Sequence, residues 1–111
     1  MLTFLSIVVG LQDEVRKGNG FILRTDGTVE DYNPDAESKV YNFNELKTKC
    51  GMDLAQILSL NNHGMLVCDE EAMFTGKAVN PLATMLFRLA FNDNSLGVIG
   101  DCVYCPSNAI N

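Results

Sequence analysis

The sequence predicts an α+β domain, with one mostly antiparallel sheet of five to six strands and two helices packed on one face. Three observations lead to this class. Short apolar or alternating runs bounded by turn residues indicate strands in the segments 21–32, 52–69 and 96–105. Two segments, 42–51 and 80–91, carry capping residues around an apolar stripe. A chain of 111 residues supports one core, so we expect a single domain.

The first apolar run of the chain ends at Leu11 and has no basic residues before it. It is too short to span a membrane and does not have the order of a signal peptide. We therefore interpret it as a buried strand or a helix turn. At the other end of the chain, residues 106–111 are expected to form a tail.

The segment 21–32 predicts a β-hairpin, because apolar residues alternate with polar ones around Asp26 and Gly27. An Asp-Gly pair is typical of a type I′ turn. Residues 52–60 and 65–69 predict two further strands, joined by the turn NNHG.

Both helices are predicted from their ends. Asn42 caps the first, Glu45 completes a capping box three residues later, and Gly51 supplies the left-handed residue after the last turn. Asn80 caps the second helix, and Pro81 takes the first helical position, where its missing N–H costs nothing. The apolar body LATMLFRLAF predicts that this second helix is deeply packed.

The last strand, LGVIGDCVYC, contains Gly100, which we expect at a bulge or a close approach, and ends in the C-x-x-C pair Cys102 and Cys105. That spacing suits a redox pair or half of a zinc site, for which Cys68 and His63 are the further candidates. No helix follows to activate a thiol, and residues i and i+3 of a strand point to opposite faces. We therefore expect four reduced packing cysteines, with no metal and no cofactor.

The net charge of −6 and the pI near 4.5 argue against direct nucleic-acid binding, which requires a basic face. The acidic turn Asp69, Glu70 and Glu71 is expected at the solvated tip of a strand pair formed by residues 69–80. His63, the only histidine, lies in the NNHG turn. No nucleophile elbow or phosphate-binding loop is present, so we assign these four residues to an interaction surface.

The order of elements resembles a small family known only as a domain of unknown function, found in phages, conjugative elements and large DNA viruses. Three short motifs carry the resemblance: a D-E turn at Asp69 and Glu70, an N-x-x-A helix entry at Asn80, Ala83 and Thr84, and a G-D strand at Gly100 and Asp101. It covers about residues 21–105 and leaves residues 1–20 as an N-terminal extension or an added strand. The resemblance implies a viral or mobile-element accessory protein and brings no catalytic residues.

We therefore expect a small, cytoplasmic, non-enzymatic protein that binds a protein partner through a sheet edge or the acidic turn. An edge strand could also pair with a second copy of the chain, and no membrane association is expected. Two alternatives stay open. One is an acidic nucleic-acid mimic that inhibits a host defence protein. The other is a small zinc-binding or thiol-redox protein that uses Cys102 and Cys105.

Overall fold

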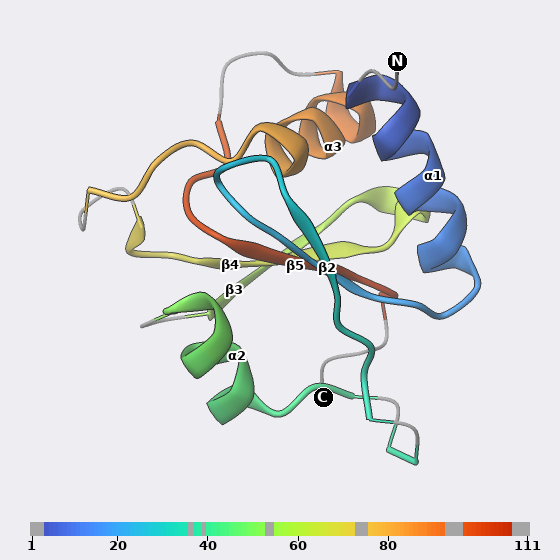
Figure 1. Cartoon of the computed structure of the whole chain (residues 1–111). Coiled ribbons are helices and arrows are strands. Elements are labelled where there is room, and N and C mark those ends of the chain that lie inside the picture. Colours follow the sequence, from blue (N-terminus) through green and yellow to red (C-terminus); the bar gives the residue numbers. More distant parts are fainter. Residues whose placement is uncertain are drawn as a thin grey trace.

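The computed structural model describes residues 4–35, 37–38, 40–52, 55–72, 76–92 and 97–107. Its strands form one antiparallel sheet in the order β2-β1-β5-β4-β3 (Figure 1). The strands are β1 (Phe21–Leu23), β2 (Val29–Asp31), β3 (Ala55–Ser59), β4 (Met65–Asp69) and β5 (Cys102–Cys105). The helices are α1 (Phe4–Arg16), α2 (Phe43–Cys50) and α3 (Pro81–Phe91), with a 3-10 turn η1 (Asn61–His63) between β3 and β4. The predicted α+β class and the single antiparallel sheet are confirmed.

The helices cover both faces of the sheet, with α1 and α3 on one side and α2 on the other (Figure 1). On the side called here the α3 face, Leu66 and Tyr104 pack in one core cluster with α1 and α3. On the α2 face, Val67 and Val103 pack with α2. The prediction that both expected helices share one face is therefore wrong. Because β4 and β5 are buried at every position, both of their faces carry apolar side chains that must be covered.

The N-terminal segment, expected to be an extension or an added strand, forms helix α1 over Phe4–Arg16. Val8, Leu11 and Val15 recur at helical spacing and are buried in the α3-face core. The helical period of these residues, rather than the length of the apolar run, decides the structure. Among the described residues, no helix is long and apolar enough to cross a membrane.

The β1–β2 hairpin is confirmed, with Phe21 paired to Asp31 and Leu23 paired to Val29. The type I′ turn is wrong, because that turn needs positive φ at both central residues, and of the pair only Gly27 has it, at 89°. Instead, the Asp26 carboxylate accepts hydrogen bonds from the backbone N–H and the hydroxyl of Thr28, at 2.9 and 2.6 Å. The side chain thus organises a longer loop.

The predicted N-cap at Asn42 and the predicted left-handed residue at Gly51 are confirmed. The Asn42 side chain accepts from the backbone N–H groups of Asn44 and Glu45, and Gly51 ends α2 with φ of 64°. The Glu45 carboxylate, predicted to complete a capping box, accepts from the Tyr32 hydroxyl at 3.3 Å rather than from the Asn42 N–H. This contact ties α2 to the end of β2.

At α3, Asn80 caps and Pro81 begins the helix as predicted. Deep packing holds for the Leu82 and Leu86 side, whereas Leu89 and Phe91 are 49% and 43% exposed. The apolar stripe of α3 is therefore wider than the surface that the sheet offers it.

The β3–η1–β4 hairpin is confirmed, with Ala55 opposite Asp69 and Ser59 opposite Met65. The strand pair predicted over 69–80 is not formed by the described part of that segment, where the only β-contact is a bridge between Val79 and Ile99. Gly100 has φ of 84°, and a Cβ added there would lie 3.2 Å from the Lys77 side chain. The close approach expected at Gly100 is therefore confirmed.

Candidate binding edge of the sheet

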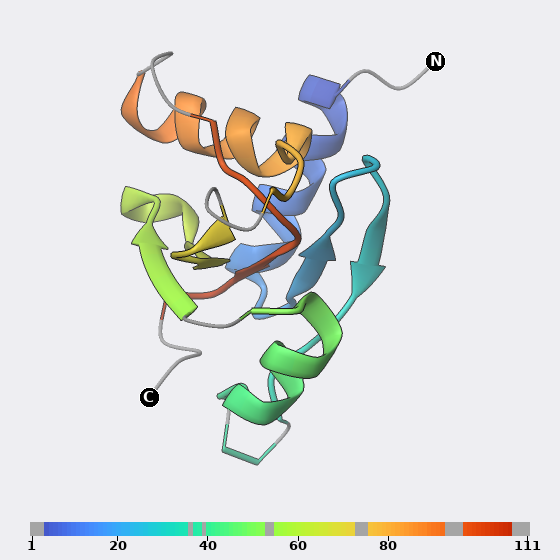
Figure 2. The same ribbon diagram turned by 90° about the vertical axis from the view of Figure 1, so that its left-hand side faces the viewer.

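Strand β3 lies at the outer edge of the sheet, and no described strand pairs with its outer side (Figure 2). Its sequence, AQILS, contains neither a charged residue nor proline. Natural edge strands usually carry such residues, because an unprotected row of backbone N–H and C=O groups invites another strand to pair. β2, the opposite edge, follows this rule with Glu30 and Asp31. The β3 edge is therefore less protected against pairing with an added strand than the β2 edge.

Hydrogen bonding within the sheet shows which backbone groups of β3 face outward. The Leu60 N–H donates to the Gly64 carbonyl at 2.9 Å, so the backbone of Leu60 faces β4. Along an antiparallel strand, the backbone N–H and C=O groups of successive residues point alternately to one neighbouring strand and to the opposite side. Leu58 and Gln56 therefore also face β4, and the N–H and C=O groups of Ala55, Ile57 and Ser59 point outward. Tracing the alternation across the sheet from the β1–β2 hairpin gives the same assignment.

The side chains of β3 divide between the two faces of the sheet. Leu58 packs against the α3-face core, and Gln56 stands on the same face because it is two residues away. Ile57 stands on the α2 face and is 48% exposed. The edge thus offers an apolar contact on its α2 side and leads to a pocket on its α3 side.

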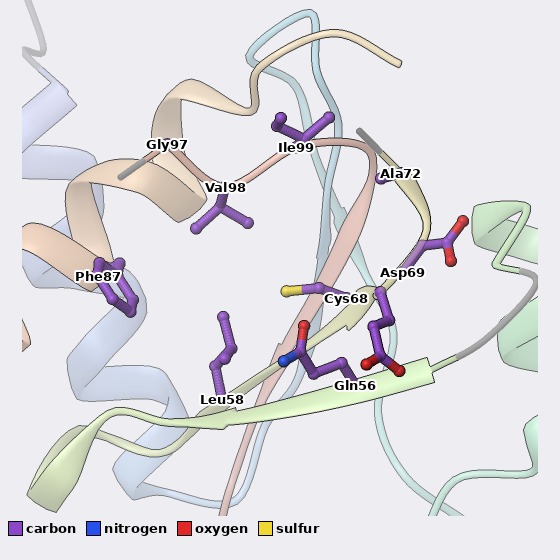
Figure 3. Close-up of a pocket in the computed structure, with 10 residues that line it drawn as sticks. Gln56, Leu58, Cys68, Asp69, Ala72, Phe87, Gly97, Val98 and Ile99 are labelled. Atoms are coloured by element: carbon purple, nitrogen blue, oxygen red, sulfur yellow. The ribbon is translucent and has the colours of Figure 1, made fainter. Parts of the chain in front are cut away.

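That pocket has a volume of about 270 Å³ and lies between β3, β4, α3 and residues 97–99. Leu58, Cys68, Phe87 and Val98 direct their side chains toward the shared space (Figure 3). Its lining is mainly apolar, whereas Gln56, Asp69 and Glu70 contribute the polar groups. Because Gln56 and Leu58 belong to the edge strand itself, a strand added outside β3 would lie next to the pocket.

Of the three acidic residues predicted to be solvated, Asp69 departs from the prediction. The Asp69 side chain is only 1% exposed and forms an ion pair with Lys77 at 2.7 Å. The ammonium of Lys77 also donates to the Gly51 carbonyl at 2.7 Å, which joins the β4 end to the α2 end. Asp69 is therefore a structural anchor, and its charge is compensated. Glu70 and Glu71 are exposed, and Glu70 lines the pocket.

His63 does not join this acidic group, because it precedes β4 whereas Asp69 ends that strand. Its ring nitrogen Nδ1 lies 3.3 Å from the Arg16 guanidinium, and its carbonyl accepts a hydrogen bond from the Tyr104 hydroxyl. These contacts connect η1 to α1 and β5. The predicted interaction residues thus fall into two separate places. Asp69 and Glu70 line the pocket beside the edge, and of these two only Glu70 is exposed.

The C-x-x-C pair is divided by the sheet, as strand geometry predicts. Cys102 lies in the α3-face core with Cys68, and Cys105 lies in the α2-face core with Cys50. All four thiols are free and buried. Burial raises the pKa of Cys105 to about 12 and that of Cys50 to about 11, and hydrogen bonding with Cys68, followed by burial, raises the pKa of Cys102. The described residues include no group of three or more His, Cys, Asp or Glu placed to hold a metal ion.

The motifs behind the family resemblance hold the fold together. The Asn80 side-chain amide donates to the carbonyls of Gly100 and Leu23, at 3.0 and 2.7 Å. Asp101 accepts from the Arg24 guanidinium and from the Thr25 backbone N–H, both at 2.9 Å. These residues join α3, β1 and the start of β5, which explains their pattern without a binding or catalytic role.

Sequence reasoning missed the pocket beside β3, whose walls come from four separate segments. One available signal was the uncharged run AQILS, since edge strands rarely lack charge. Comparison of the chain with protein-family models, curated proteins and solved structures finds no significant match.

Proposed function

We propose that this chain is a small non-enzymatic accessory protein that binds an extended segment of another protein along the outer edge of β3. One observation carries the proposal. Ala55, Ile57 and Ser59 direct backbone N–H and C=O groups outward from a strand with no charge or proline to deter pairing. Strand addition uses such main-chain groups for affinity and neighbouring pockets for side-chain choice.

The thiol-redox and zinc alternative receives less support. A reactive cysteine needs a lowered pKa and solvent access, whereas burial raises the pKa of Cys105 to about 12. Cys102 and Cys105 also stand on opposite faces of the sheet, so they cannot act on one substrate or one metal ion together.

The acidic-mimic alternative is weakened by local pairing of its charges. Asp69 is buried against Lys77, Glu30 pairs with Arg24 at 2.9 Å, and Asp13 lies 3.4 Å from Lys17. A mimic of the phosphate backbone needs exposed, uncompensated charge along one surface. We also propose an origin from a virus or mobile element, for which the short motifs are the support, and action inside the cell, for which the four free, buried cysteines are the support.

A displayed library of strand-forming peptides, selected on the immobilised protein, tests the proposal. We expect the selected peptides to lose binding to Ile57→Pro, because proline removes an outward N–H and places its ring on the pairing side. Ile57→Ala is the matched control, since it shortens the side chain and keeps the N–H. Peptides that bind Ile57→Pro as well as the unchanged protein would contradict binding at this edge.

A further inference from the structure

We infer that the bound segment carries an apolar residue and a Lys or Arg two positions apart, the first filling the pocket beside Leu58 and the second facing Glu70. This inference rests on the proposed function, because it describes the partner of the same edge. It follows from strand register, from the lining of the pocket and from the charge at its rim.

Register decides which partner side chains reach the pocket. Residues opposite each other on neighbouring strands direct their side chains to the same face. The partner residues opposite Gln56 and Leu58 therefore stand on the α3 face, and the residue between them stands on the α2 face against exposed Ile57. Two partner residues, two positions apart, thus direct their side chains to the side of the sheet that holds the pocket.

The lining selects the residue opposite Leu58. That end of the pocket is bounded by Leu58, Phe87 and Val98, and the Cys68 thiol forms its floor (Figure 3). Transfer of an aliphatic or aromatic side chain from water to such a surface is favourable, whereas a charged side chain would lose its hydration there without gaining a partner. We therefore expect the partner residue opposite Leu58 to be apolar.

The charge at the rim selects the residue opposite Gln56. Ala55 is paired with Asp69, so Glu70 lies near the Ala55 end of β3. Asp69 is compensated by Lys77, whereas Glu70 is exposed and borders the pocket. A Lys or Arg opposite Gln56 can extend its apolar stem over the edge and bring its charge to Glu70. The net charge of −6 favours the approach of such a basic segment.

A second copy of the chain does not meet these requirements. In any register, β3 contains no Lys or Arg that could face Glu70 of the other copy. Two chains of net charge −6 also repel each other as they approach. The geometry therefore points to a different protein, one with a basic and apolar strand segment.

Synthetic fluorescent peptides of about nine residues, alternating threonine and valine around a central lysine-x-leucine or leucine-x-lysine, provide the probe. Both orders are needed because the added strand can run in either direction. Replacing the leucine with aspartate should weaken binding about tenfold, because the apolar contact is lost. Replacing the lysine with glutamate should weaken binding about fivefold at low salt, and Glu70→Lys should restore it.

Two protein variants separate the pocket from the edge. Gln56→Phe adds a ring on the pocket side and should weaken binding of the leucine peptide about tenfold. Ser59→Phe is the matched control, since Ser59 is also exposed and the same ring would stand on the α2 face of the sheet, away from the pocket. Circular dichroism of each variant confirms that the fold is retained.

Loss of binding with Gln56→Phe but not Ser59→Phe, together with the Glu70→Lys rescue, would support the inference. Binding that depends on Ile57 but is indifferent to the leucine and the lysine would overturn it and leave the proposed edge function standing. Binding indifferent to Ile57→Pro would overturn both. A dimer in sedimentation experiments that Ile57→Pro dissociates would also overturn the inference, because the occupant would then be a second copy.

Discussion

Replacing Asn80 with alanine removes more than a helix cap. The Asn80 side chain is fully buried, and its oxygen accepts from the Ala83 N–H at 3.1 Å. Its amide nitrogen donates to Leu23 in β1 and to Gly100 before β5. One side chain therefore begins α3 and attaches it to two neighbouring segments of the sheet.

The magnitude follows from these three hydrogen bonds. Loss of an N-cap costs about 1 kcal/mol, and each buried hydrogen bond contributes about 1 kcal/mol. Asn80→Ala should therefore lower the free energy of unfolding by about 3 kcal/mol, a large part of the stability of a domain of this size. Asn80→Ser keeps a capping oxygen but cannot reach both carbonyls, so it should cost about 2 kcal/mol.

Urea denaturation followed by circular dichroism measures these differences. Asn42→Ala is the internal control, because Asn42 caps α2 from an exposed position and should cost only about 1 kcal/mol. If Asn80→Ala cost no more than Asn42→Ala, the two carbonyl contacts would contribute nothing, and the structural role assigned to Asn80 would be refuted.

Three further predictions concern the edge, the buried ion pair and the thiols. Leu58→Pro removes a bond of the β3–β4 ladder, so it should cost about 2 kcal/mol more than Ile57→Pro in urea denaturation; equal costs would contradict the assignment of outward groups. Lys77→Met removes the cation beside the buried Asp69 carboxylate and should lower the free energy of unfolding by about 2–3 kcal/mol, whereas a neutral result would show that the pair is not structural. The pKa of Cys105 is raised to about 12 and that of Cys50 to about 11, so the folded state keeps protons that the unfolded chain releases. Their contribution to stability should therefore be fully present below pH about 9 and fall as the pH rises from about 9 towards 12, as denaturation at a series of pH values would show.

Residues with a local physical signature made much of the fold predictable. Asn42, Gly51, Asn80 and Pro81 take their predicted places because a cap is determined by neighbours within a few residues. The separation of Cys102 from Cys105 follows in the same way from the alternation of a strand.

The remaining features depend on contacts between distant segments. The helix faces could not be assigned from the caps, because a cap does not indicate which side of the sheet a helix covers. Asp69 was predicted to be exposed because it begins an acidic run, yet its burial depends on Lys77, eight residues further on. The pocket beside β3 joins segments from Gln56 to Ile99, so no local pattern could predict it.

Amide hydrogen exchange of β3, measured residue by residue with NMR, tests the central claim most directly. In the free protein, the amides of Ala55, Ile57 and Ser59 should exchange fast, whereas those of Gln56 and Leu58 should be protected by β4. Addition of the lysine- and leucine-containing strand peptide should slow exchange at the three outward amides and leave the other two unchanged. Unaltered exchange at Ala55, Ile57 and Ser59 in the presence of bound peptide would contradict binding along the edge of β3.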